Sequence, residues 1–243
     1  MPDLPARPLG FKEAMFEAAV EGRKTLTSRV IVPQPTEDAD RKIGHIGPEL
    51  GGDPTLFRTW LDRTAEGKGA CETDYNPETW RCRYGPVGTP LYLQEPFKVV
   101  AIGGGEWPDS RVVQYKWHDT SGGWGNLRTL WPPDSHLDKP AAQPRDSFLS
   151  PRFMPQWAAR WWSRNEGVEV ARVQDITRED CFAEGIRRDQ DLRHDTPAQT
   201  ATWPIDSFAH LWDSINAKRG YPWAANPWVW RIRFAQPEEA RDG

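Results

Sequence analysis

The sequence predicts an α+β fold, a small and mostly antiparallel β-barrel with helices at its ends. Three observations support this prediction. Several short stretches alternate between apolar and polar residues, as half-buried strands do, while others carry apolar residues at helical spacing. The 23 prolines and 20 glycines among 243 residues favour short elements joined by many turns.

The first predicted elements are a helix and a strand. Apolar residues recur at the spacing of one helical face, at Phe11, Met15, Ala18 and Ala19. We expect Gly22 to end this helix, because glycine adopts the left-handed conformation of a helix C-terminus without penalty. From Thr25 to Val32 β-branched residues dominate, which favours a strand.

The middle of the chain gives weaker signals. The apolar residues of Pro54–Ala65 predict a helix, and alternation predicts strands at Leu91–Val100 and Val112–His118. The stretch from Trp131 to Pro151 has no period, and we expect a loop there. A loop of this length often serves as a lid or a binding element.

Four elements are predicted in the last third of the chain. Val168–Val173 alternates as a half-buried strand does. Thr177 and Asp180 form a pattern similar to a capping box, which predicts a helix that ends at Gly185. The last predicted helix and strand are Ser207–Ala217 and Trp228–Phe234.

Composition and charge limit the classes of function. The hydrophobic content is only 37%, but 14 tryptophans supply a large apolar area for a core. The net charge is −4, whereas a protein that holds an anionic polymer usually has a basic balance, so RNA binding is disfavoured. We find no apolar run of about 18 residues and no signal-peptide pattern, so we expect a soluble, cytoplasmic protein without a membrane partner.

The cysteines do not predict a metal site. Cys71, Cys82 and Cys181 lack Cys-x-x-Cys spacing, and none of the five histidines stands beside them. We therefore expect free thiols, and neither a metal nor another cofactor.

The segment Gly22–Arg29, with the sequence GRKTLTSR, carries the clearest chemical signal. Lys24 stands where the helix gives way to the strand, so its side chain can reach the strand face that carries Thr27. A lysine beside a threonine hydroxyl is a candidate base and nucleophile. The alternative is structural, because lysines near helix C-termini often bind carbonyl groups and threonine packs well in strands.

The longer string EGRKTLTSR resembles the signature of ASCH-domain proteins, which have a PUA-like β-barrel. It is most similar to N4-acetylcytidine amidohydrolases and to phage-encoded ASCH proteins. Three other segments resemble the family in the same order: Gly88–Phe97, Phe153–Ile186 and Phe208–Phe234. The resemblance implies one domain over residues 1–243, with insertions at about 33–86 and about 103–150.

The resemblance also implies a function and a catalytic set. The chain is expected to remove the acyl group from N4-acylated cytosine nucleosides, so its partner would be a small modified pyrimidine nucleoside. Thr27 would be the nucleophile, Lys24 its base, and Glu184 the acid and base for the leaving group. Two departures remove positive charge and weaken a polynucleotide interpretation: Gln94 stands where the family commonly has arginine, and Ser28 where phage relatives often have it.

Six further residues are candidates for substrate binding. The arginines would lower the pKa of Lys24 by charge repulsion, and the aromatic residues would form a flat slot for the pyrimidine ring. The set is Arg23, Arg29, Phe11, Glu95, Trp157 and Phe182.

Three rival functions stay open at this stage. An RNA-binding module is supported by fold analogy alone and opposed by the charge balance. A ribonuclease that uses the same lysine, and a phage accessory protein without chemistry, are the other two.

Overall fold

The computed structural model describes residues 4–36, 41–45, 56–61, 79–104, 109–117, 127–187 and 197–240. The chain forms two compact units. Unit 1 contains Met1–Gly22, Pro90–Arg164 and Gln236–Gly243, and unit 2 contains Arg23–Thr89 and Asn165–Ala235. The single domain stays a prediction.

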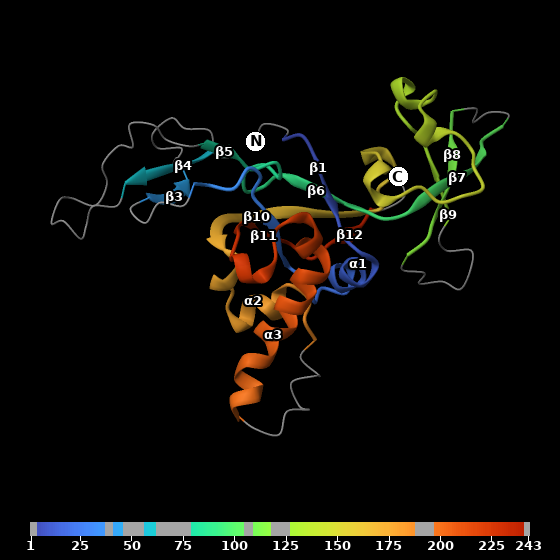
Figure 1. Ribbon diagram of the computed structural model, residues 1–243. Helices are drawn as coiled ribbons and strands as arrows, with labels where there is room; N and C mark the ends of the chain where they lie inside the picture. The colour runs from blue at the N-terminus through green and yellow to red at the C-terminus, as the bar shows by residue number, and fades with distance from the viewer. Residues whose placement is uncertain are drawn as a thin grey trace. The chain divides into compact units, whose positions relative to one another are not determined.

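The α+β class is confirmed, with mostly antiparallel sheets and few helices (Figure 1). In the residues that the structure describes, no sheet closes into a barrel. The strands form three sheets, and the strand order of each is open at both ends. None of the described helices combines the length and the apolar character needed to cross a bilayer.

Unit 1 contains two ladders. The first is formed by β1 (Arg7–Gly10), β6 (Pro90–Gln94), the first residues of β10 (Trp161–Arg172) and β12 (Glu238–Glu239). β1 is parallel to β6, and the other pairs are antiparallel. The second ladder is formed by β7 (Phe97–Ile102), β8 (Arg111–Tyr115) and β9 (Leu127–Leu130).

Of two predictions for unit 1, one is corrected and the other is confirmed in outline. The strand predicted at Leu91–Val100 is two strands, β6 and β7, separated by Glu95 and Pro96. Proline has no amide hydrogen to donate to a ladder, which interrupts the pairing. The predicted loop from Trp131 to Pro151 is confirmed in outline and contains two short 3-10 turns, at Asp134–His136 and Pro140–Ala142.

Helix α1 (Glu13–Val20) lies in unit 1 and confirms the first predicted helix. Phe16 is fully buried, and its ring centroid is 5.5 Å from that of Trp117. Gly22 has a φ of 77°, so the predicted glycine does adopt the left-handed conformation after the helix.

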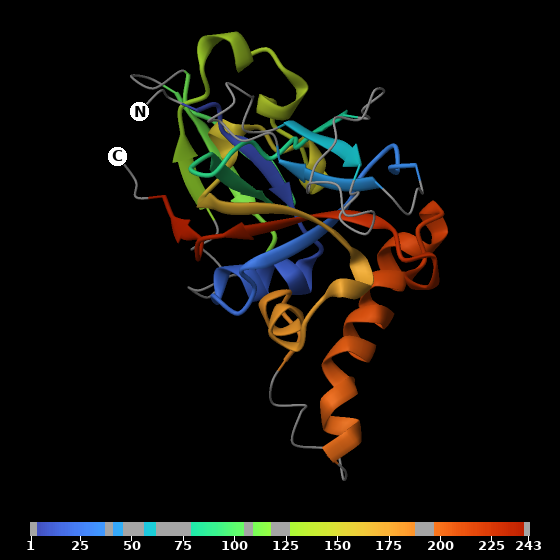
Figure 2. The ribbon, with the colours of Figure 1, turned by 90° about the vertical axis from the view of Figure 1, so that its left-hand side faces the viewer.

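Unit 2 is built on an antiparallel ladder of β2 (Leu26–Val30), β11 (Trp228–Phe234) and the second part of β10 (Figure 2). The predicted strand Trp228–Phe234 is confirmed at both ends. β11 lies between the other two strands, so β2 is an edge strand of this ladder. A second ladder joins β3 (Arg41–His45), β4 (Leu56–Leu61) and β5 (Thr79–Arg81).

The helix predicted over Pro54–Ala65 is wrong where the structure describes it, because Leu56–Leu61 is strand β4. The apolar residues fit both a helix and a strand over so short a run. Cross-strand pairing decides, since Phe57 is opposite Trp80 in β5 and its ring contacts Trp230 at a centroid distance of 4.8 Å. The rest of the predicted helix lies outside the described residues.

Helices α2 (Arg178–Ala183) and α3 (Pro197–Asn216) cover one face of the β2–β11 pair. Their shared core consists of Val173, Ile176, Cys181, Phe208, Trp212 and Val229. α3 begins ten residues before the predicted Ser207 and includes Pro204.

The predicted capping box of α2 is confirmed. The Asp180 amide donates to Thr177 Oγ1 at 3.1 Å, and the Asp180 carboxylate accepts from the Thr177 amide. Arg233 on β11 also donates to Asp180, at 2.8 Å. Burial by itself would raise the pKa of Asp180, but the hydrogen bonds from Thr177 and Arg233 outweigh it and hold the pKa below its ordinary value.

Asp180→Asn tests this cap. Because the folded-state pKa is lowered, the carboxylate stabilises the fold above its ordinary pKa, and this contribution disappears as the pH falls through the lowered value. We expect the variant to lose about 1 kcal/mol of unfolding free energy near neutral pH. When urea unfolding is measured between about pH 7 and about pH 2, Asp180→Asn should lose less unfolding free energy on acidification than wild type does. Glu179→Gln, at the exposed neighbouring position, should retain the wild-type profile.

Candidate functional site

Lys24 and Glu184 are 160 residues apart and meet in unit 2. They form an isolated antiparallel bridge between the residues that precede β2 and the C-terminal end of α2. The Thr25 amide donates to the Ala183 carbonyl at 2.8 Å and fixes the two segments together. Glu184 caps α2, and Gly185, with a φ of 100°, then turns the chain away.

The side chains of Lys24 and Glu184 form a buried ion pair. Lys24 Nζ lies 2.5 Å from Glu184 Oε2, and the two side chains are 2% and 5% exposed. Nζ also donates to the backbone carbonyls of Leu26, at 2.8 Å, and Glu184, at 2.9 Å. An ammonium has three hydrogens, so these three acceptors use its full capacity.

The pair occupies the open edge of β2. Thr25 and Ile31 bond to β11, so the alternating residues Leu26 and Ser28 direct their backbone groups to the other edge. There the Ser28 amide donates to Glu184 Oε1 at 2.5 Å, and the Leu26 carbonyl accepts from Lys24. The two side chains therefore replace the neighbouring strand that an edge strand lacks.

Burial lowers the pKa of Lys24 below its ordinary value, because a charged ammonium loses its hydration in this position. The negative charge and the hydrogen bond of Glu184 oppose this shift, and the charge of Arg29 adds to it. The predicted repulsion from Arg29 thus acts in the expected direction.

Thr27 lies on β2 between Leu26 and Ser28, and is 3% exposed. It is opposite Ile232 of β11, and its side chain points to the face of β2 opposite that of Ser28. The structure thus brings Lys24 and Glu184 into contact. Thr27 is the neighbour in sequence of Ser28, whose amide holds the Glu184 carboxylate.

The other candidates divide between the two units. Arg23 is exposed beside Lys24, Arg29 is half-buried on β2, and Phe182 is buried on α2 with Arg178 over its ring at 5.6 Å. Phe11 and Trp157 are half-buried in unit 1. Their role in binding a pyrimidine, like that of Glu95 in unit 1, stays a prediction.

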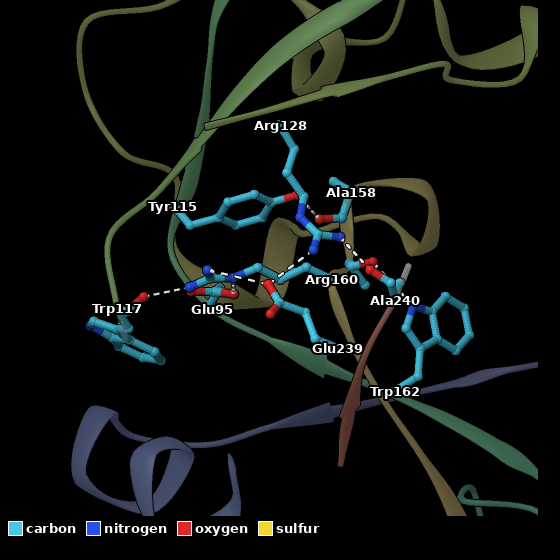
Figure 3. A network of polar contacts seen from close by, with 10 residues as sticks. Glu95, Tyr115, Trp117, Arg128, Ala158, Arg160, Trp162, Glu239 and Ala240 are labelled. Carbon is cyan, nitrogen blue, oxygen red and sulfur yellow. Dashed lines mark hydrogen bonds and ion pairs between the residues drawn. The ribbon is translucent and has the colours of Figure 1, made fainter. Parts of the chain in front are cut away.

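Glu95 lies at the centre of a buried network in unit 1 (Figure 3). Arg160 binds its carboxylate with two hydrogen bonds, of 2.7 and 3.0 Å, and also donates to the Trp117 carbonyl at 2.5 Å. The guanidinium lies over the Tyr115 ring, 4.6 Å from the centroid. Burial raises the pKa of Glu95 despite the opposing effect of Arg160.

The same network holds the C-terminal segment of unit 1 (Figure 3). Arg128 donates to the Glu239 carboxylate at 2.9 Å and to the Ala240 carbonyl at 2.8 Å. The Ala240 amide donates to the Arg160 carbonyl at 2.7 Å. These contacts give Arg160 and Glu95 a clear structural role.

The sequence analysis missed the backbone groups that complete the site. The Ser28 amide and the Leu26 carbonyl bind the ion pair, and no residue-type signal marks such groups. The predicted strand Thr25–Val32 contains both residues, but the partner across its open edge depends on tertiary structure.

The free thiols that the sequence predicts are present at the two cysteines that the structure describes. Cys82 and Cys181 are free and buried, and burial raises their pKa values to about 11 and about 12, respectively. Cys71 lies outside the described residues. Among the residues that the structure describes, no three His, Cys, Asp or Glu side chains gather as metal ligands would.

Comparison of the chain with protein-family models, with curated proteins and with solved structures finds no match.

Replacement of one partner should reveal the coupling within the ion pair. Lys24→Met leaves the Glu184 carboxylate buried without its cation, and we expect it to lower the unfolding free energy by about 3–5 kcal/mol. The double variant Lys24→Met, Glu184→Leu removes both charges and should recover a large part of that loss. Chemical denaturation of both single variants and the double variant measures the coupling. Additive losses would contradict a coupled pair.

Proposed function

We propose that the chain is an amidohydrolase that removes the acyl group from N4-acylated cytosine nucleosides, and that it has a PUA-like fold of the ASCH family. The products would be cytidine and a carboxylic acid. The observation that carries the proposal is the buried 2.5 Å contact between Lys24 Nζ and Glu184 Oε2. The order of the ASCH-like segments in the sequence supports the same family.

The contact suits a pair of groups that share a proton. Moving one proton along it converts ammonium and carboxylate into amine and carboxylic acid, which avoids buried charge. Both forms satisfy their hydrogen bonds. In the neutral form, the two amine hydrogens bind the carbonyls of Leu26 and Glu184, and the nitrogen lone pair accepts from the carboxyl group. The lowered pKa of Lys24 agrees with an accessible neutral amine.

This pair supplies both functions that amide hydrolysis needs. The Glu184 carboxyl group first exchanges its hydrogen bond to Lys24 for one to the leaving nitrogen, which frees the amine lone pair. Thr27 Oγ1 then attacks the acyl carbonyl carbon while its proton passes to the amine of Lys24. The bond between the acyl carbon and N4 then breaks as the Glu184 carboxyl group delivers its proton to the leaving nitrogen. Cytidine departs, and the acyl group stays on Thr27 as an ester.

Water completes the cycle. It attacks the ester carbon and gives one proton to the Glu184 carboxylate, and the Lys24 ammonium returns its proton to Thr27 Oγ1. The carboxylic acid leaves, and the amine and carboxyl group are restored. The leaving amine is a weak base because the pyrimidine ring withdraws its lone pair, which lowers the barrier to its departure.

Ultraviolet absorbance of N4-acetylcytidine tests the proposal directly. Wild type should convert it to cytidine, whereas Lys24→Met, Thr27→Val and Glu184→Gln should each lower kcat by about 10²–10⁴-fold. Thr89→Val is the matched control, since Thr89 is a buried threonine of the same unit whose hydroxyl has no hydrogen-bond partner in the described chain. It should retain wild-type turnover.

Three results would change this proposal. An unaltered substrate spectrum with folded wild-type protein removes the amidohydrolase. Near-normal turnover by Thr27→Val removes the acyl-enzyme and leaves direct attack by water. Binding of single-stranded RNA that is tight and falls steeply with salt would favour the rival RNA-binding function.

A further inference from the structure

Arg231 is a buried arginine on β11 whose charge lacks an acidic partner in the described chain. The residue is 5% exposed. Its Nη2 donates to the Arg172 carbonyl at 3.1 Å, while its Nε is buried without a hydrogen-bond partner among the described residues. A guanidinium has five donor hydrogens and stays charged, so one carbonyl leaves it largely unsatisfied.

Ser28 is the direct cross-strand partner of Arg231. The backbone bonds of this ladder fall on the alternate residues such as Thr25 and Ile31, so Ser28 and Arg231 form a non-hydrogen-bonded pair. Side chains at such pairs lie close together on one face. Ser28 Oγ is also buried and has no partner in the described chain. Two unsatisfied donors therefore lie side by side.

The described carboxylates near this pair do not form ion pairs with Arg231. Asp180 binds Arg233 at 2.8 Å, and Glu184 binds Lys24 and the Ser28 amide. Glu169 is opposite Arg231 on β10, but it is exposed and forms no ion pair with Arg231 among the described contacts. Arg231 lies on the same face of β11 as Val229, which belongs to one core cluster with Cys181 of α2, so its side chain lies on the α2 side of the ladder.

We propose that Ser28 and Arg231 form a subsite for a small carboxylate anion. A carboxylate can accept hydrogen bonds from the Nε edge of the guanidinium and from the serine hydroxyl at once, and it neutralises the buried charge. The choice of a carboxylate rests on the proposed function, because hydrolysis of an acyl amide releases this class of product.

The subsite is joined to the ion pair through one residue. Ser28 holds Glu184 Oε1 with its amide, and its side chain lies on the same strand face as that of Arg231. A bound carboxylate would therefore lie beside the group that we propose as the acid and base. The subsite faces α2, on the side of β2 opposite the Thr27 side chain, so it would receive the released acid rather than hold the ester.

Titration of the full chain with acetate tests the subsite. Calorimetry at constant ionic strength, with chloride as the balancing salt, should show one acetate site in wild type. Arg231→Gln should weaken acetate binding by about 10- to 100-fold, and Ser28→Ala by about 2- to 10-fold. Arg233→Gln is the matched control, because Arg233 lies on the same face of β11, is 53% exposed and is already paired with Asp180. It should bind acetate as wild type does.

Thermal unfolding adds a readout that a purely structural arginine would not change. Acetate should raise the Tm of wild type and leave that of Arg231→Gln unchanged. If Arg231→Gln does not fold, the acetate affinity of Ser28→Ala tests the subsite instead, because this variant removes a single hydroxyl. The subsite would be overturned if wild type does not bind acetate, or if Arg233→Gln weakens acetate binding as much as Arg231→Gln does. Either result would indicate that water alone bridges these donors. If wild type binds acetate but does not hydrolyse N4-acetylcytidine, only the proposed function is contradicted. If it hydrolyses N4-acetylcytidine but does not bind acetate, only the subsite is contradicted.

Discussion

The open edge of β2 is the constraint on which the rest of unit 2 depends. An edge strand presents amide and carbonyl groups that must find partners once they are buried. Here the partners are the side chains of Lys24 and Glu184, which bind the Leu26 carbonyl and the Ser28 amide. The C-terminal end of α2 is thereby fixed to the start of β2. A contact that completes a β-ladder also brings an amine and a carboxyl group together in a dry environment.

Two buried ion pairs in the described part of the chain differ in the chemistry that they permit. In unit 1, Arg160 binds Glu95 with two hydrogen bonds and is stacked on Tyr115. A guanidinium does not release a proton in proteins, so that pair can hold segments together but cannot transfer protons. Lysine can lose its proton when it is buried, which is why we assign the chemistry to Lys24 and Glu184.

Buried charge without a partner is the second feature that connects structure to function. Burial of an unpaired ion is unfavourable, and proteins usually provide a counter-charge. Lys24, Arg160 and Arg233 each have a carboxylate partner in the described chain, whereas Arg231 has only a backbone carbonyl. The unsatisfied donors of Arg231 and Ser28 lie next to the proposed acid, so a ligand that satisfied them would also be close to the reaction.

Local signals in the sequence predicted the elements that depend on local physics. Strict alternation located β11, the pairing of Thr177 with Asp180 located the start of α2, and Gly22 marked the end of α1. The Lys24 and Thr27 candidates came from the short motif itself, and Glu184 from a family resemblance. Where the local signal was ambiguous, as in β4, the prediction was wrong, and the start of α3 was predicted ten residues too late.

Tertiary structure alone decided which groups meet. The sequence determined that a lysine follows a helix and precedes a strand, and that Glu184 ends a short helix. It did not determine that the strand would lie at an edge, or that its open edge would be filled by these two side chains. Ser28 and Arg231 became neighbours only through the register of β2 on β11, because register depends on the pairing of strands that are distant in the chain.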